Sequence, residues 1–322
     1  MGRFILRRAL SALVVLFTTS VIAFLLFFVT PGVDPAARIA GRSATPATLA
    51  AVRHSFGLDQ PLPVQYVKMM QHLFITRDLT SFVNRGAKVV PQIIAATPIT
   101  LSLVFGTAII SMVVAAAFGL VSAVHKGRFV DPFLMALAVL GISVPVFWLG
   151  EIANLLTQGG LHSSVFSWVP PLGYVPLTAN IGLWALHLLF PWITMSVLYA
   201  GVYSRVLRGE MITTLGEQFI QAARAKGISE RRLVWRHAFR CALVPVTALF
   251  GLDIGVLVGG AALLTEVVFG LPGVGYLTYQ SLQTVDLPMI MGTVIYAAFF
   301  VVLMNAIVDI VHARLDPRVR HA

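Results

Sequence analysis

The sequence has 322 residues, of which 58% are hydrophobic and only 11% are charged, and its mean hydropathy is +0.87. A soluble domain carries about 45–50% apolar and about 25% charged residues, so this composition excludes an ordinary soluble domain and a disordered chain. The single cysteine, Cys241, can form no disulfide within the chain, which excludes a disulfide scaffold. The net charge of +10 lies between long apolar runs, and we interpret it as a signature of membrane insertion rather than of nucleic-acid binding.

Six apolar runs in the sequence are long enough to cross a bilayer as helices. A helix rises about 1.5 Å per residue, so about 20 residues cross about 30 Å of hydrocarbon. The predicted spans cover residues 9–29, 98–123, 133–156, 181–203, 242–269 and 289–311. The first span follows three arginines, as a signal peptide would, but it is longer than the usual signal core of about 7–15 residues. We therefore predict an all-α integral membrane protein with six transmembrane helices, the first being a retained anchor within residues 1–30.

The basic residues predict how the chain is oriented. Sixteen of the 23 Lys and Arg lie in four segments on one side, residues 1–8, 124–132, 204–241 and 313–322. The two short opposite loops, 157–180 and 270–288, contain none. Because short loops rich in Lys and Arg stay in the cytoplasm, both termini are predicted to be cytoplasmic. The other seven basic residues lie in residues 31–97, a segment long enough to be translocated regardless of charge, which we assign to the outside.

The extracytoplasmic segment 31–97 is too polar to span the membrane and is expected to contain two short helices. Thr45 followed by Pro46 is typical of a helix start, and Gly57 is typical of the end of that helix. Apolar residues near helical spacing predict a second helix over residues 63–74. We expect these helices to pack on the outer mouth of the bundle or to meet a partner there, with a plain spacer as the alternative.

The loop 204–241 between the fourth and fifth spans carries the most information. Ile212, Leu215, Phe219 and Ala222 recur at intervals of three and four, which predicts one face of an amphipathic helix. Small residues then lead to Gly227, so another protein's backbone could approach this helix closely. The surrounding arginines favour an acidic or polar partner, and the alternative is a loop that merely lies on the membrane surface.

This loop is similar to the cytoplasmic coupling loop of ABC importer permeases, in the variant found in the peptide/nickel permeases. The similarity rests on residues 222–227 (AARAKG), 229–232 (SERR) and 236–238 (RHA). Other stretches resemble the same family in the same order: 57–62 (GLDQPL), 266–275 (EVVFGLPGVG), 286–288 (DLP) and 315–320 (LDPRVR). One departure is Gln221, where the family's loop begins with Glu, so no salt bridge is expected from that position.

The resemblance implies the type I ABC importer transmembrane fold and a place in a larger assembly. Residues 98–312 would form the transmembrane domain, 204–241 its coupling loop and 313–322 a cytoplasmic tail. The implied partners, besides membrane lipid, are a second homologous permease subunit, two ATP-binding subunits and an extracytoplasmic substrate-binding protein. The implied function is translocation of oligopeptides or dipeptides across the bacterial inner membrane into the cell.

The sequence itself indicates that the energy comes from a partner. It contains no Gly-Lys dipeptide, so the phosphate-binding loop G-x-x-x-x-G-K-[ST] is absent. We therefore expect no catalytic residues, no bound cofactor and no metal in this chain, and we expect partner subunits to use the ATP. The expected ATPase-docking residues are Gln221, Ala222, Ala223, Arg224, Lys226, Gly227, Arg231 and Arg232.

Acidic residues inside the spans are candidates for the translocation path: Asp253, Glu151 and Glu266. Asp253 lies near the middle of the bilayer, where a carboxylate is costly and normally faces a cavity or a partner. It either lines the path or is a protonated or hydrogen-bonded group between helices. Glu151 and Glu266 lie near the outer ends of their spans, and for both the alternative is extension into the headgroup region.

Three glycines on the predicted fifth span form a packing stripe. Gly251, Gly255 and Gly259 recur every four residues and allow another backbone to approach, so we expect them at the interface with the second permease. Asp253 is offset by about 200° from Gly251 and is expected to point away from that stripe.

Other interpretations stay open at this level. The solute could be nickel, glutathione or another small molecule, because the recognised motifs are scaffold motifs rather than pocket motifs. An ion-coupled secondary carrier using Asp253 and Glu266 would predict repeated halves, which the sequence does not show. An intramembrane enzyme would need a nucleophile–base pair or a metal triad, and the sequence offers neither.

Overall fold

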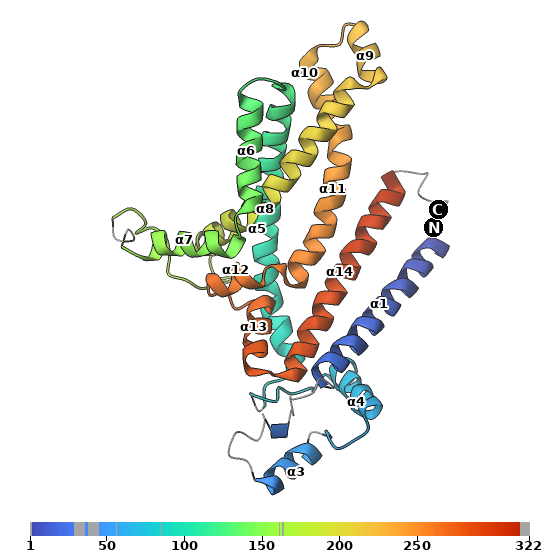
Figure 1. Cartoon of the computed structure of the whole chain (residues 1–322), viewed down its shortest axis with the longest axis vertical. Coiled ribbons are helices and arrows are strands. Elements are labelled where there is room, and N and C mark those ends of the chain that lie inside the picture. Colours follow the sequence, from blue (N-terminus) through green and yellow to red (C-terminus); the bar gives the residue numbers. More distant parts are fainter. Residues whose placement is uncertain are drawn as a thin grey trace.

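The computed structural model describes residues 2–28, 36–37, 45–55, 57–84, 86–160, 162 and 164–315 (Figure 1). Its helices are α1 (Gly2–Phe28), α3 (Pro46–Ser55), α4 (Leu62–Phe74), α5 (Val89–Val124), α6 (Val130–Ser143), α7 (Val146–Gln158), α8 (Ile181–Gly216), α9 (Gln218–Ala225), α10 (Glu230–Arg232), α11 (Phe239–Val256), α12 (Leu263–Val268), α13 (Val274–Thr284) and α14 (Leu287–Leu315). Two π-helical stretches, Leu233–Ala238 and Leu257–Ala261, flank α11. The all-α prediction is confirmed for these ranges, in which the extended backbone pairs only at one isolated bridge, Thr80 to Lys88.

Within the part of the chain that the structure describes, five helices are long and apolar enough to cross a membrane, or six if one bent pair counts as a span. The unbroken candidates are Arg7–Phe27, Val89–Val124, Ile181–Gly216, Glu230–Ala261 and Leu287–Ile310. In Figure 1, α5, α6, α8, α11 and α14 form an elongated bundle, with α3 and α4 at one end and α9 at the other.

The predicted third span is not one straight helix. It consists of α6 and α7, which meet at an angle of 94°, so that α7 runs across the bundle (Figure 1). The break falls at Val144 and Pro145, both in extended conformation. A proline disfavours the helical conformation of the residue before it, and this local constraint explains the bend.

The predicted fifth span also ends earlier than expected. Helix α11 is followed directly by the π-helical stretch Leu257–Ala261, in which Gly260 has a φ of 141°. Only glycine adopts such a backbone without steric cost, so the chain turns here and continues as α12. Helix α12 packs against α7, whose Asn154 side chain donates a hydrogen bond of 2.7 Å to the carbonyl of Val268.

Close contacts between α8 and its neighbours build the core of the bundle. A Cβ atom placed on Gly106 of α5 would lie 2.0 Å from the Trp192 ring, and one on Gly119 would lie 2.8 Å from Leu207. On the other side, a Cβ atom on Gly201 would lie 2.5 Å from the carbonyl oxygen of Ala138 in α6. Helices in lipid gain van der Waals contact where small residues let their backbones approach, and these glycines serve that purpose.

The glycine stripe, which runs from α11 (Gly251 and Gly255) into the π-helical stretch that follows it (Gly259), packs inside the chain. This packing corrects the expected interface with a second permease. Cβ atoms on Gly251, Gly255 and Gly259 would lie 2.3, 2.9 and 3.0 Å from side-chain atoms of Val308, Met304 and Val301. These three neighbours all belong to α14. The stripe is therefore covered by the last helix of the same chain.

Helix α1 joins the bundle through α14 and α4. Arg8 forms an ion pair with Asp309, which brings the start of α1 next to the far part of α14. Toward the other end of α1, the hydroxyls of Ser20 and Tyr66 are 2.7 Å apart, and Phe24 packs edge-on against the Tyr66 ring.

The two helices expected in the outer segment are present as α3 and α4. The Thr45 hydroxyl accepts a hydrogen bond of 3.3 Å from the Thr48 amide and caps α3. Helix α4 packs on the bundle through Met69 and Leu73, which are buried with residues of α1, α5 and α14. Beyond α4, hydrogen bonds from the Thr76 hydroxyl and His72 lower the pKa of Asp78.

A buried carboxylate fastens this outer segment to the bundle. Asp286 is 5% exposed and accepts hydrogen bonds from the Ser81 hydroxyl and, at 3.0 Å, from the Phe82 amide. The Asp-Leu-Pro stretch at 286–288 therefore has a structural explanation: its carboxylate replaces the water that the loop 81–84 would otherwise bind.

Candidate functional site

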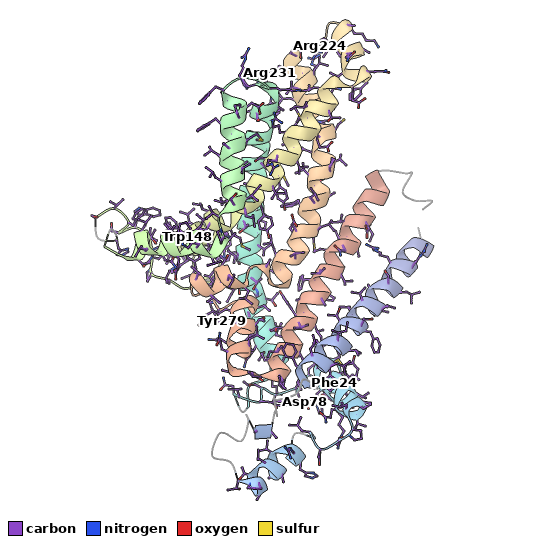
Figure 2. The ribbon with its side chains drawn as sticks, in the orientation of Figure 1. Phe24, Asp78, Trp148, Arg224, Arg231 and Tyr279 are labelled. Carbon is purple, nitrogen blue, oxygen red and sulfur yellow. The ribbon has the colours of Figure 1, made fainter. Side chains whose placement is uncertain are left out.

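The loop between α8 and α11 forms the tip of the molecule farthest from α3 and α4 (Figure 2). Helix α9 carries Gln221, Ala222, Ala223 and Arg224, followed by Lys226, Gly227 and the α10 residues Arg231 and Arg232. All of these residues are exposed except Ala223, which is half-buried. The structure thus places all the predicted docking residues at the same end of the molecule (Figure 2).

The amphipathic face expected in this loop is half right: Ile212 and Leu215 pack against a buried cluster, whereas Phe219 and Ala222 are exposed. Helix α8 continues through Ile212 and Leu215 to Gly216, and the extended Glu217 separates it from α9. Phe219 is 48% exposed, whereas Ile220 is completely buried. The reason is the break at Glu217, which rotates α9 relative to the pattern that a continuous helix would follow.

Ile220 anchors α9 to the bundle. It is buried in a cluster with Tyr203, Leu207 and Met211 of α8 and with Ala238 and Ala242 at the start of α11. Gln221 adds a hydrogen bond of 3.1 Å from its side-chain amide to the carbonyl of Gly216, the end of α8. Helix α9 therefore contacts α8 and the π-helical stretch Leu233–Ala238, which leads into α11.

The turn after α9 is held by one ion pair and one left-handed glycine. Arg224 donates two hydrogen bonds to the Glu230 carboxylate, and this pair raises the pKa of Arg224. Gly227 has a φ of 81°, and a Cβ atom there would meet nothing within 4 Å. Glycine is needed at this position for its backbone conformation, while the space around it is open.

Asp253 lies between α8 and α11. It is half-buried, and its carboxylate accepts a hydrogen bond of 2.7 Å from the hydroxyl of Tyr203, a residue that is 1% exposed. Tyr203 also packs against Phe250, one turn earlier on α11. The carboxylate points away from the glycine stripe, because the stripe faces α14 and Tyr203 belongs to α8.

Glu266 neither lines a path nor reaches the headgroups, which corrects both expectations for this residue. It is 0% exposed and accepts hydrogen bonds from the Thr100 hydroxyl at 2.6 Å and from the Tyr276 amide at 2.9 Å. The Thr100 hydroxyl oxygen in turn accepts from the Val274 amide at 2.9 Å. Glu266 thereby joins α5, α12 and α13, and it fills the space over two glycines of the stretch 266–275.

Glu151 is exposed on α7, and its part in a path stays a prediction. No group of three or more His, Cys, Asp or Glu side chains suited to a metal ion occurs among the described residues.

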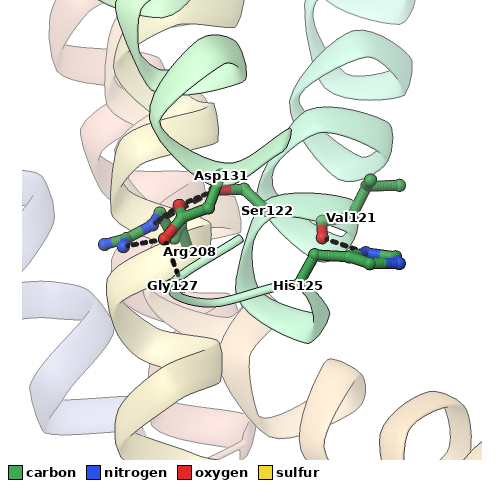
Figure 3. Close-up of polar contacts among 6 residues, drawn as sticks. All are labelled: Val121, Ser122, His125, Gly127, Asp131 and Arg208. Carbon is green, nitrogen blue, oxygen red and sulfur yellow. Dashed lines mark hydrogen bonds and ion pairs between the residues drawn. The ribbon is translucent and has the colours of Figure 1, made fainter. Parts of the chain in front are cut away.

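The ion pair of Asp131 and Arg208, together with Ser122, connects α5, α6 and α8 (Figure 3). These residues are not singled out by the sequence. Arg208 donates to both carboxylate oxygens of Asp131, at 2.6 and 2.7 Å, in a bidentate arrangement. Asp131 also accepts from the Ser122 hydroxyl at 2.5 Å and from the Gly127 amide at 3.3 Å. The side chain of Asp131 is 7% exposed, so this pair is largely removed from water. The available signal was an aspartate in the first turn of a helix, which alone indicates only a favourable helix start.

An apolar groove of about 820 Å³ runs along α5, α8 and α11 beside this core. Its walls include Phe105 and Met112 of α5, Trp184 of α8, and Phe250 and Ile254 of α11. Phe250 and Ile254 flank Asp253 in the sequence, so the groove and the carboxylate share one stretch of α11.

The fold and this exposed loop define a multi-span helical membrane protein with a basic loop exposed at one end. The chain matches the family model described as binding-protein-dependent transport system inner membrane component over residues 115–321. It also matches the corresponding N-terminal membrane component over residues 1–104. The chain belongs to this family, and it is a multi-pass permease subunit of an ABC transporter in the inner membrane.

Relatives cover the chain from end to end. A probable peptide ABC transporter permease of Sinorhizobium fredii is 35% identical over 321 residues, which is 100% of each chain. A glutathione transport system permease of Salmonella typhimurium is also 35% identical over 321 residues and 100% of each chain. A probable D,D-dipeptide transport system permease of Escherichia coli is 34% identical over 315 residues, covering 93% of this chain and 92% of its own.

The first prediction concerns Glu266. Glu266→Gln leaves one acceptor oxygen for two donors, the Thr100 hydroxyl and the Tyr276 amide, and an unmade buried hydrogen bond costs about 1–3 kcal/mol. We expect a clear fall in the thermal unfolding temperature of the detergent-purified chain. Glu151→Gln, on an exposed carboxylate, is the matched control, and equal unfolding temperatures for the two variants would contradict the structural role of Glu266.

The second prediction concerns the Asp131–Arg208 pair. Arg208→Met leaves a buried carboxylate without its cation, and breaking such a pair costs about 3–5 kcal/mol. The double variant Asp131→Leu with Arg208→Met removes both charges and should recover most of the lost thermal stability. If the double variant is as unstable as Arg208→Met, the uncompensated charge is not the cause.

Proposed function

We propose that this chain is the permease subunit of an ATP-driven importer that carries peptides into the cell. The observation that carries the proposal is similarity over the whole chain to permeases named for peptides and for a D,D-dipeptide. The glutathione permease fits the same chemistry, because glutathione is a tripeptide. In this assembly the chain pairs with a second homologous permease, two ATP-binding subunits and an external substrate-binding protein, and both of its termini lie in the cytoplasm.

Helix α9 is the part that receives the work of ATP hydrolysis in this proposal. Its exposed side presents Ala222, whose small side chain allows a cleft of the ATPase subunit to approach closely, while Arg224, Arg231 and Arg232 fix the orientation. The buried Ile220 then transmits the movement, because it belongs to a cluster shared by α8, the π-helical stretch Leu233–Ala238 and α11. A pull on α9 tilts these two helices together.

The movement of α8 reaches the α5–α6 hairpin through the Asp131–Arg208 pair. Arg208 lies on the same helix that Ile220 contacts, and its two hydrogen bonds to Asp131 allow little sliding. Helix α11 ends at the glycine turn near Gly260, so its tilt need not displace α12. We infer that α5, α6 and α8 move as one body, with α11 able to move beside them.

The peptide path in this proposal runs along the apolar groove of α5, α8 and α11, with Asp253 as its polar point. A half-buried carboxylate attracts the ammonium end of a peptide. The apolar walls accept varied side chains without selecting among them. The Tyr203 hydroxyl stabilises the empty carboxylate. Glu151, exposed on α7, is a second candidate for contact with the ammonium group.

Reconstitution of the complete importer tests this function. Vesicles that contain both permeases, the ATPase subunits and the binding protein should accumulate a labelled tripeptide only when ATP is supplied. Unlabelled peptides should compete, whereas nickel ions should not. Glutathione as the strongest competitor would favour glutathione as the physiological cargo, and uptake without any ATPase subunit would contradict the proposal in favour of a self-sufficient carrier.

The third prediction concerns α9. Ala222→Tyr should leave the chain inserted and able to support ATP hydrolysis, yet overpacking a tight contact costs about 1–3 kcal/mol, so uptake should fall by about tenfold. Ala222→Ser is the matched control and should behave as the native chain. Gly227 is less suitable, since its φ of 81° means that any larger residue also strains the backbone. Normal uptake by Ala222→Tyr would contradict docking through this face.

A further inference from the structure

A second groove, distinct from the proposed peptide path, lies between α6 and α8. It has a volume of about 780 Å³ and begins beside the Asp131–Arg208 pair, toward the end of the bundle that carries α9. Its lining comprises Asp131, Pro132, Met135, Val139, Ile142, Val202, Arg205, Val206 and Arg208. The groove thus combines one charged end with apolar walls.

The charged end of this groove has an excess of one positive charge. Asp131 is neutralised by the two hydrogen bonds from Arg208 and has further donors in Ser122 and Gly127. Arg205, one turn before Arg208 on α8, is exposed and forms no ion pair among the described residues. Arg205 is therefore a cation available for an external anion.

The walls of the groove follow one face of each helix. On α6, Pro132, Met135, Val139 and Ile142 are spaced as neighbours along one side, over about 15 Å at 1.5 Å per residue. On α8, Val202 and Val206 face them one turn apart. Both helices belong to candidate membrane spans, so the apolar part of the groove lies at the depth of hydrocarbon chains.

We propose that this groove binds an anionic phospholipid of the leaflet on the α9 side, which the distribution of basic residues assigns to the cytoplasm. The lipid phosphate pairs with Arg205, and one acyl chain lies between α6 and α8. Basic pockets between transmembrane helices on the cytoplasmic side are suited to anionic headgroups, because the cation compensates the phosphate where water is scarce.

Charge complementarity favours a lipid over a second protein subunit as the occupant. A protein partner would have to bury an acidic residue against Arg205 at the membrane surface, where anionic headgroups are already concentrated. The groove along α5, α8 and α11 has a comparable volume but carries no charged residue in its lining, which consists of apolar residues with Ser102 and Trp184. The Arg205 groove is therefore matched to a molecule with an anionic end and a long apolar tail.

Native mass spectrometry of the purified, complete importer tests the proposal. The probes are phosphatidylglycerol, phosphatidylcholine with the same acyl chains, and glycerol phosphate. We expect the importer to retain phosphatidylglycerol in preference to phosphatidylcholine and to retain no glycerol phosphate. Arg205→Gln should weaken phosphatidylglycerol binding by about fivefold, the change that corresponds to ~1 kcal/mol for one basic residue near an anionic surface.

Two further variants make the result decisive. Met135→Trp fills the apolar part of the groove and should weaken the binding of both lipids, which a purely electrostatic contact would not do. Arg240→Gln removes an exposed cation of α11 outside this groove and should leave the binding unchanged. Equal retention by the native importer and Arg205→Gln would overturn the proposal. An equal loss of phosphatidylglycerol binding in Arg240→Gln would also overturn it. Phosphatidylglycerol binding to the isolated chain but not to the complete importer would overturn it as well, because the second permease would then cover the groove.

Discussion

A carboxylate buried in the bundle must find its hydrogen-bond donors within the chain, because burial removes it from water. Asp131 finds them in Arg208, Ser122 and Gly127, and Glu266 finds them in Thr100 and Tyr276. In each case the donors come from other helices or turns, so satisfying the carboxylate also fixes how those elements pack. The architecture depends on these buried acidic groups at the points where helix directions change.

In the proposed mechanism, the chain combines contacts that resist movement with contacts that allow it. The α5–α8 contact is made by glycines under bulky side chains, and a bidentate ion pair joins α8 to α6; such contacts resist sliding. Helix α9 is attached by one buried isoleucine and a short break at Glu217, and the glycine turn after α11 separates it from α12. In the proposed mechanism, this distribution suits a subunit that its partners move. Helices α5, α6 and α8 form a rigid body, α9 receives the force at one end, and α11 can move between them.

The proposed lipid groove and the proposed peptide path differ in the sign of the charge near them. Both are lined largely by apolar residues. One ends in the uncompensated Arg205, whereas the other includes Phe250 and Ile254, which lie on the same stretch of α11 as Asp253. In the two proposals, these opposite charges attract opposite ends of amphiphilic molecules: Arg205 pairs with a lipid phosphate and Asp253 with a peptide ammonium group.

The sequence by itself determined the class of the protein, its membrane-spanning helices, the two outer helices α3 and α4, and the family. These follow from apolar length, helix-start residues and local motifs, which act over one segment at a time. It could not determine that residues 133–156 bend by 94°, because a proline marks a boundary without giving its angle. Nor could it decide whether the glycines of α11 face α14 or another subunit, whether Glu266 is exposed, or that Arg208 reaches Asp131. Those outcomes depend on which helices become neighbours, and only tertiary packing brings residues such as 131 and 208 or 100 and 266 within hydrogen-bonding distance.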